Sequence, residues 1–337
     1  MLQPLFVLVG PTAVGKTKVA VEIALRVGGE IVSADSMQIY RGMDIGTAKP
    51  TPAERRGVPH HLIDICDPGT AFSVADFQRL ARKAIAGIAA RGHLPLLVGG
   101  TGLYVESLTG AYELDDLATD WELRHQLEAE AARAGDAALH ARLRALDPIA
   151  AERIHPNDRR RIVRALEVTL RTGRPFSQTA HRRRAPEYDL LQVGLTAPRP
   201  ILYERINRRV DEMIAAGLVE ETRRLLAAGY GWTLTARQAI GYKELIPYIE
   251  GKASLAECIA ALKRATRRYA KRQLTWFRRD RRINWIELGE NIELPAVVEE
   301  ICRLIAGFWP AGIKYNGRET ASINSSWRAE ADDETSD

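Results

Sequence analysis

A phosphate-binding pattern lies near the start of the 337-residue chain. Residues 10–17 satisfy the pattern G-x-x-x-x-G-K-[ST], and they follow the apolar run 5–9, which is typical of a strand buried on both faces. Glycine allows a turn whose backbone N–H groups point at an anion, and the helix that follows adds its positive end. The pattern predicts a site for a diphosphate or triphosphate, formed by Gly10, Pro11, Thr12, Ala13, Val14, Gly15, Lys16 and Thr17.

Two side chains of this loop have expected roles. In loops of this type Lys16 reaches the outer phosphate and the Thr17 hydroxyl binds a magnesium ion.

The end of the next expected strand supplies a carboxylate. The strand expected over 30–34 ends at Asp35, and ligands of a doubly wound sheet lie at the carboxyl ends of its strands. Asp35 could hold magnesium, take a proton from an acceptor or cap the next element, and the residues alone leave these alternatives open.

Other strand ends offer further polar groups. The strand over 94–98 is followed by Gly99-Gly100-Thr101-Gly102, whose glycines would let the backbone approach a ligand and whose threonine offers a hydroxyl. A short strand is expected over 60–65, where His60 and His61 would point to opposite faces and so do not predict a shared metal site. Residues 39–50 show no period and are expected to form a loop over the site.

Two arginines share one face of a helix expected over 203–228. Arg205 and Arg209 are four residues apart, so their side chains lie on the same stripe. Two planar guanidinium groups could clamp a leaving diphosphate, because each matches the geometry of phosphate oxygens. The alternative is that both arginines are exposed and pair with Glu204 or Glu212.

The order of the elements predicts the fold class. Strands and helices alternate through the first hundred residues, which is typical of a P-loop NTPase-like α/β fold with a parallel sheet flanked by helices. The composition then shifts to alanine- and charge-rich helical segments, before a strand returns at 190–195. We therefore expect a catalytic core over 1–111 and 189–310, an inserted all-helical domain over 112–188 and a disordered acidic tail over 311–337.

Basic residues are concentrated in three parts of the chain, although the formal net charge is only +5. They lie within 159–164, 182–184 and 263–282. A single charged run is usually a solvated helix face, but three runs in a protein that also binds phosphates favour a polyanionic partner.

Composition also bears on the compartment. No apolar run approaches the ~18 residues of a membrane span, and the first four residues lead directly into the expected strand, so neither a membrane segment nor a signal peptide is expected. Cys66, Cys258 and Cys302 are widely spaced and odd in number, which favours a reducing cytoplasm and argues against a disulfide framework or a zinc site.

Two reaction types fit these residues. A kinase would transfer a phosphoryl group, whereas an alkyl transferase would hold a diphosphate as the leaving group. Because most P-loops bind nucleoside triphosphates such as ATP, the pattern alone weakly favours a kinase.

Eight segments, taken in order, resemble the bacterial tRNA dimethylallyltransferases. The resemblance runs from about residue 4 to residue 288 and leaves 311–337 outside. Each segment alone is moderately specific, but all of them in order leave little room for coincidence. They are GPTAVGKT, ADSMQIYRGMDIGTAKP, HHLIDICDP, FSVADF, LLVGGTGLY, DPIAAERIHPNDRRRIVRALEV, QAIGYKEL and TRRYAKRQLTWFRR.

The resemblance implies an activity and its partners. A dimethylallyl group would pass from dimethylallyl diphosphate to the exocyclic amine of the adenosine 3′-adjacent to the anticodon in tRNA, with release of diphosphate. The expected partners are this donor and the tRNA anticodon stem-loop, the expected cofactor is Mg²⁺, and the enzyme is expected to be a monomer. Thr12 and Lys16 would hold the diphosphate, with magnesium at Thr17. The implied catalytic residues are Asp35 as general base, with Thr101 and Arg209 near the leaving diphosphate.

The resemblance also implies a surface for tRNA, which must present the target adenosine splayed out of its loop. The helical insertion domain belongs to this surface, and Arg267 to Gln273 are expected to contribute to it. The remaining implied contacts are Asp35, Ser36, Met37, Gln38, Thr101, Arg124, Arg160, Arg161, Ile162, Val163, Arg164, Gln238, Ala239, Ile240, Gly241, Tyr242 and Lys243.

Two alternatives remain beside this activity. An adenylate prenyltransferase would modify a free nucleotide, but it would need neither the helical insertion nor the basic helix expected over 254–277. The other alternative is a P-loop kinase of a small molecule.

Overall fold

A computed structural model describes residues 2–110, 120–179, 186–229, 239–291, 293–310, 313–315 and 318–321. The chain divides into two compact units, which we call the core unit (Met1–Thr109 and Glu187–Asp337) and the insert unit (Gly110–Pro186). Within the described residues, no helix combines the length and the apolar character that a membrane crossing requires.

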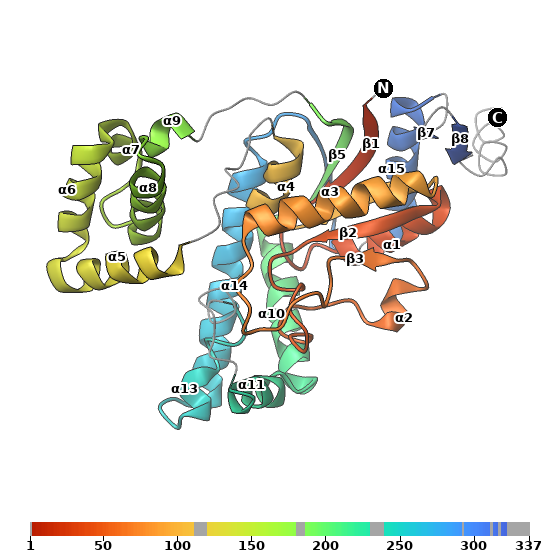
Figure 1. Cartoon of the computed structure of the whole chain (residues 1–337). Coiled ribbons are helices and arrows are strands. Elements are labelled where there is room, and N and C mark those ends of the chain that lie inside the picture. Colours follow the sequence, from red (N-terminus) through yellow and green to blue (C-terminus); the bar gives the residue numbers. More distant parts are fainter. Residues whose placement is uncertain are drawn as a thin grey trace, which may run out of the picture. The chain divides into compact units, whose positions relative to one another are not determined.

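A six-stranded parallel sheet forms the centre of the core unit (Figure 1). Its order is β3-β2-β4-β1-β5-β6. The register pairs Val9 with Gly99 and Ala34 with Gly99, so β1, β2 and β4 end at one edge of the sheet. The strands are β1 (Gln3–Val9), β2 (Gly29–Ala34), β3 (His60–His61), β4 (Leu94–Gly99), β5 (Tyr188–Thr196) and β6 (Ile283–Glu287). The predicted parallel α/β sheet is confirmed.

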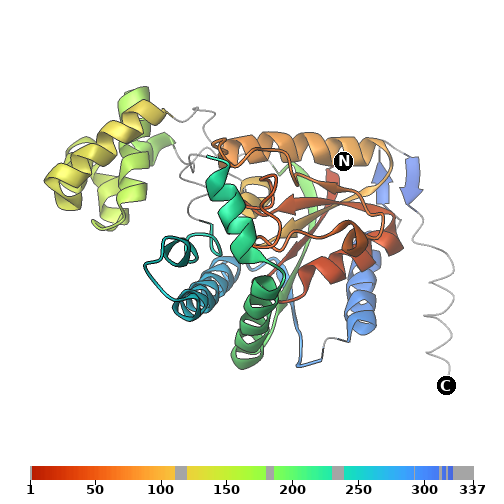
Figure 2. The ribbon, with the colours of Figure 1, turned by 90° about the horizontal axis from the view of Figure 1, so that it is seen from below.

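Alternation along the strands divides the core between the two faces of the sheet. Phe6 and Leu8 belong to the cluster that contains α1 and α15, whereas Leu5, Val7 and Val9 belong to the cluster with α3 and α4. Figure 2 shows α3 on one side of the strands and α1 and α15 on the other. The helices of this unit are α1 (Lys16–Val27), α2 (Pro52–Arg55), α3 (Val74–Ala90), α4 (Gly102–Thr109), α10 (Arg199–Ala215), α11 (Leu218–Ala227), α13 (Ile246–Ile249), α14 (Leu255–Phe277) and α15 (Leu294–Phe308).

Three sequence-based expectations differ from the structure. The helix expected over 203–228 is two helices, α10 and α11, because Gly217 adopts the left-handed conformation (φ 99°) between them. The strand expected over 60–65 stops after two residues, since Leu62 and Asp64 have positive φ. Within the tail expected to be disordered, β7 (Ile313–Tyr315) and β8 (Arg318–Ala321) form an antiparallel pair.

The insert unit is helical and has a hydrophobic core of its own. Its core includes Leu127, Leu139, Leu143, Ile162 and Leu166. The helices are α5 (Trp121–Ala134), α6 (Asp136–Leu146), α7 (Pro148–Arg153), α8 (Arg159–Thr172) and α9 (Phe176–Thr179). The all-helical character predicted for this part of the chain is therefore what the structure shows for its described residues.

A buried carboxylate lies at the amino end of β2, away from the strand ends that form the site. Glu30 is only 3% exposed, and it accepts hydrogen bonds from Arg91, His61 and His93 at 2.6–3.0 Å. These donors outweigh the cost of burial and lower the pKa of Glu30 to about 2.

Replacing Glu30 with glutamine should lower the free energy of unfolding at pH 7 by about 1–3 kcal/mol. Because the folded pKa lies below the ordinary 4.5, the carboxylate's contribution is complete above pH 4.5 and is lost as the pH falls towards 2. Thermal unfolding at pH 7 and pH 3 should therefore show a deficit that shrinks at the lower pH. Glu299→Gln on the surface of α15 is the control, and a deficit independent of pH would contradict the assignment.

Candidate functional site

The loop between β1 and α1 adopts a tightly constrained conformation. Gly10 has φ 149°, and a Cβ added to it would lie 2.4 Å from the carbonyl oxygen of Leu195 on β5. Gly15 (φ 108°) precedes α1, and Ala13 (φ 63°) occupies the left-handed region although it is not glycine. The Lys16 ammonium group donates to the carbonyl oxygens of Gly10 and Pro11, at 2.9 and 2.8 Å.

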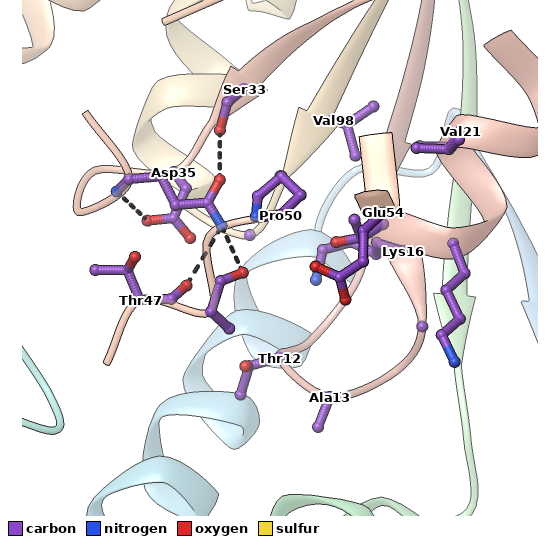
Figure 3. Close-up of a pocket in the computed structure, with 18 of the residues that line it drawn as sticks. Thr12, Ala13, Lys16, Val21, Ser33, Asp35, Thr47, Pro50, Glu54 and Val98 are labelled. Carbon is purple, nitrogen blue, oxygen red and sulfur yellow. Dashed lines mark hydrogen bonds between the residues drawn. The ribbon is translucent and has the colours of Figure 1, made fainter. Parts of the chain in front are cut away.

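A pocket of about 700 Å³ opens beside this loop. Figure 3 shows Thr12, Ala13 and Lys16 on one side of it and Asp35 and Thr47 on the other. Side chains from α10 and α14 also line the pocket, so segments that are far apart in the sequence form it. The polar groups that line it include Thr12, Lys16, Thr17, Ser33, Asp35, Gln38, Glu54, Arg209, Tyr269 and Gln273.

Asp35 occupies the position that the sequence predicted, at the carboxyl end of β2. Its Oδ1 accepts hydrogen bonds from the backbone N–H groups of Met37 (2.8 Å) and Gln38 (3.4 Å), so it does cap the following turn. Within the described residues, Oδ2 accepts no hydrogen bond, which leaves that oxygen for a proton. Burial raises the pKa of Asp35, although the two N–H groups and the Lys16 and Arg209 charges oppose the increase.

Two cations share the pocket with this carboxylate. Burial and the nearby Arg209 guanidinium lower the pKa of Lys16 to about 7, while Asp35 opposes the decrease. Burial also lowers the pKa of Arg209, and Asp35 opposes that decrease as well. Two desolvated cations with one carboxylate are a strong site for an added anion, because a bound diphosphate would compensate the excess positive charge.

The two arginines of α10 line the pocket but have different environments. Arg205 is only 8% exposed, and its guanidinium donates to the carbonyl oxygens of Gly289 and Glu290. The alternative of two exposed arginines paired with Glu204 or Glu212 is therefore wrong, whereas Arg205 lines the pocket and its role in binding a diphosphate stays a prediction. Arg209 lines the same pocket without such backbone contacts among the described residues.

The loop after β4 packs closely against its neighbours. A Cβ on Gly99 would lie 2.3 Å from the Ala34 oxygen, and one on Gly100 would lie 2.2 Å from the Gln273 amide nitrogen. These glycines therefore allow close contacts with β2 and α14, and both also line the pocket, where the sequence predicted that their backbone could approach a ligand. Thr101 lies in this loop, and its hydroxyl accepts a hydrogen bond from the Ser36 N–H at 3.1 Å.

Sequence reasoning missed how α14 completes the site. Gln273 is buried: its Oε1 accepts from the Thr12 N–H (2.8 Å), and its Nε2 donates to the Gly100 oxygen (2.9 Å). Tyr269, one turn earlier, hydrogen-bonds with Thr101 and Gln273. Both were expected to contact tRNA, but their spacing from Leu262 and Phe277 marks the buried stripe of an otherwise basic helix.

The other predicted tRNA contacts are distributed over both units. Ser36, Met37 and Gln38 continue from Asp35, and Gln38 lines the pocket. Ala239 and Tyr242 are buried, Ile240 is half-buried and Lys243 is exposed, while Gly241 has φ 112°. Gln238 lies outside the described residues.

In the insert unit, the predicted contacts have different environments. Arg124 and Arg164 both donate to the buried carboxylate of Glu167, at 2.9 and 2.8 Å. Ile162 and Val163 lie in the hydrophobic core, which leaves only their backbone atoms for a contact with RNA. Arg160 and Arg161 are exposed at the start of α8.

The fold and the site define the class: a P-loop α/β protein whose phosphate loop faces a carboxylate across a polar pocket. Residues 38–280 match the family model described as IPP transferase, and residues 3–66 match the one described as isopentenyl transferase. The chain belongs to the IPP transferase family, and the resemblance seen in the sequence is confirmed.

Similar proteins cover almost the whole chain. The tRNA dimethylallyltransferase of Moorella thermoacetica is 54% identical over 321 residues, which are 93% of this chain and 97% of the relative. That of Geobacillus thermodenitrificans is 53% identical over 91% of this chain and 98% of the relative.

Solved structures give the same picture. The tRNA isopentenylpyrophosphate transferase of Bacillus halodurans has a TM-score of 0.68 and 46% identity, covering 98% of this chain and 99% of that one. A eukaryotic dimethylallyltransferase, described as acting on tRNA, has a TM-score of 0.77 and 27% identity over 94% of this chain and 82% of that one.

Proposed function

We propose that this protein transfers a dimethylallyl group from dimethylallyl diphosphate to the exocyclic amine of the adenosine 3′-adjacent to the anticodon in tRNA, releasing diphosphate. The observation that carries this proposal is the pocket in which Lys16 and Arg209 face Asp35. It combines an anion site with a group able to accept a proton. The relatives named tRNA dimethylallyltransferase support the same activity.

The residues divide the reaction between them. The backbone of the phosphate loop, together with Lys16 and Arg209, binds the diphosphate and stabilises the charge that develops as it leaves. An aromatic amine is a weak nucleophile, so holding it against the allylic carbon is a large part of catalysis. As the new C–N bond forms and the C–O bond breaks, Asp35 takes the proton that the amine loses. Thr101 is held by hydrogen bonds with Ser36 and Tyr269, and Ser36 belongs to the turn that follows Asp35.

The residues that line the pocket fit a magnesium ion whose ligands come largely from the diphosphate of dimethylallyl diphosphate. Thr17 lies in the first turn of α1, next to Lys16, and lines the pocket. The described residues contain no cluster of three or more acidic, histidine or cysteine ligands, and Mg²⁺ commonly binds through few protein groups and the substrate's phosphates. Thr17 would supply the hydroxyl ligand, and the ion would neutralise charge on the departing diphosphate.

The activity is tested with purified protein and labelled dimethylallyl diphosphate. Label should move to unmodified tRNA, at the adenosine after the anticodon, and should not move to adenosine monophosphate. Transfer to the free nucleotide, or hydrolysis of ATP without transfer of label, would overturn the proposal. Mass measurement of the protein in solution tests the expected monomer, and chelation of Mg²⁺ tests the cofactor.

The exposed face of α14 supports the role of RNA. Six basic side chains on or just after it are exposed: Arg264, Arg268, Lys271, Arg272, Arg278 and Arg279. Arg267 differs from these, because it is half-buried and donates to Asn207 on α10 at 2.6 Å.

Replacing Arg264 and Arg268 with alanine should weaken tRNA binding and flatten its dependence on salt. Each lost phosphate contact reduces the slope of log affinity against log salt concentration by about 0.7–0.9. Filter binding from low to moderate salt measures this slope, and Arg303→Ala on α15 is the control. An unchanged slope in the double variant would place this face of α14 away from the RNA.

A further inference from the structure

The loop over residues 39–50 forms one wall of the pocket without a helix or strand of its own. Thr47, Ala48 and Pro50 line the pocket directly. The backbone N–H groups of such a segment need partners from elsewhere, because no regular ladder satisfies them. Their partners therefore decide how firmly this wall is held.

One buried carboxylate, Glu221 on α11, satisfies three consecutive N–H groups of the loop. Its Oε2 accepts from Asp44 (3.1 Å) and Ile45 (2.9 Å), and its Oε1 accepts from Gly46 (3.0 Å). Oε1 also accepts from the Tyr242 hydroxyl at 2.8 Å. Glu221 is only 3% exposed, and these four bonds fill the roughly four acceptor positions of a carboxylate.

Hydrogen bonds also connect the loop to the turn that follows Asp35. The Gln38 amide nitrogen donates to the Thr47 and Ala48 carbonyl oxygens, both at 3.3 Å, and its oxygen accepts from the Ser33 hydroxyl at 3.1 Å. In Figure 3 these hydrogen bonds are the dashed lines that lead from Ser33 to the Gln38 amide and from that amide to Thr47. The Gln38 N–H is also one of the two that bind Asp35. The loop and the Asp35 turn are thus one hydrogen-bonded unit.

Tyr242 connects the same carboxylate to the segment 239–243. Its ring packs against Gly46 so closely that an added Cβ there would lie 2.5 Å from the ring. Burial and the Glu221 carboxylate raise the pKa of Tyr242, so its hydroxyl stays protonated and donates. Gly46 is therefore required by this contact, and Glu221 joins the loop over 39–50 to the segment 239–243.

We propose that Glu221 is a positioning residue for the transfer reaction. It fixes residues 44–46 so that Thr47, Ala48 and Pro50 form the pocket wall and Gln38 keeps the Asp35 turn in place. This assignment rests on the proposed function, since it gives the wall its role in binding the donor and orienting the base. Glu221 itself lines no part of the pocket and acts through the loop.

The test compares three variants of the full chain. Glu221→Gln keeps the shape but places an NH₂ group where two donors point, so about half of the bonds are lost. Tyr242→Phe removes the hydroxyl's hydrogen bonds with Glu221 and with the Gly46 backbone, and leaves the three bonds from the loop to Glu221. Glu220→Gln is the control, because that neighbouring glutamate is exposed and pairs with Arg223. For each variant, kcat and KM for dimethylallyl diphosphate are measured at saturating tRNA, with amide hydrogen exchange of a peptide covering 43–49.

Glu221→Gln should lower kcat about 10- to 100-fold, because a small displacement at a reacting site has effects of this size. Amides 44–46 should exchange faster, while thermal unfolding shows the protein folded at the assay temperature. Tyr242→Phe should keep these amides protected and lose less activity, and Glu220→Gln should match the wild type.

Unchanged kcat in a folded Glu221→Gln protein, or unchanged protection of amides 44–46, would overturn the assignment. A loss of kcat explained entirely by a smaller folded fraction would do the same. If the wild type itself transferred no label, the proposed function would fail, whereas the exchange data would still report whether Glu221 holds the loop.

Discussion

Asp35→Asn should reduce turnover about 100- to 10,000-fold while the affinity for tRNA stays close to that of the wild type. Asparagine keeps a carbonyl oxygen that can accept from the Met37 and Gln38 N–H groups, so the turn after β2 is retained. It cannot accept the proton that the adenosine amine must lose. The measurements are single-turnover transfer of label and equilibrium binding of tRNA.

The pH dependence of the wild type provides a second check on the same carboxylate. Because burial raises the pKa of Asp35, the base is protonated, and turnover falls, at a higher pH than the ordinary value of 3.8 would give. Asp67→Asn is the matched control, since Asp67 is exposed and pairs with Arg41. Near-normal turnover in Asp35→Asn would refute the assignment of the base.

Lys16→Met should weaken donor binding and turnover by a combined factor of 100 or more, roughly the effect of removing a preorganised donor to a developing anion. Lys16→Met also removes a group whose charge changes near neutral pH. With its pKa near 7 in the free protein, Lys16 is largely neutral above that pH, whereas a bound diphosphate favours the ammonium form.

Donor binding should therefore take up a proton above pH 7, and KM for the donor should rise with pH by up to about tenfold per unit. Lys16→Met should lose this dependence and retain only the part due to ionisation of the donor. Lys83→Ala, on the exposed face of α3, is the control for a change in overall charge. An equally steep rise in Lys16→Met would show that another group titrates.

The parts of the site that could be predicted from the sequence are those with short-range patterns. The phosphate loop, the strand before it and the position of Asp35 at a strand end follow from local spacing and from the geometry of parallel sheets. The start of α3 depends on a short-range pattern of the same kind, because Ser73 and Asp76 form a capping box there.

The features that could not be predicted depend on contacts between distant segments. Nothing next to Gln273 in the sequence shows that its amide joins Thr12 to Gly100. The burial of Arg205 could not be predicted, because the carbonyl groups that it binds, at 289 and 290, follow a different strand. The break at Gly217 was also missed, since a single glycine within a helical pattern is often tolerated.

The phosphate loop acquires its final surroundings late in protein synthesis. β1, which precedes this loop, pairs with β5, and the pairing starts with Gln3 opposite Tyr188. The ribosome must therefore synthesise the whole insert before β1 and β5 can pair. Only then can Gly10 pack against the Leu195 carbonyl group, and the hydrogen bond from Thr12 to Gln273 requires a still longer chain. A nascent chain released before α14 would therefore contain every residue of the P-loop motif and still lack an assembled anion site.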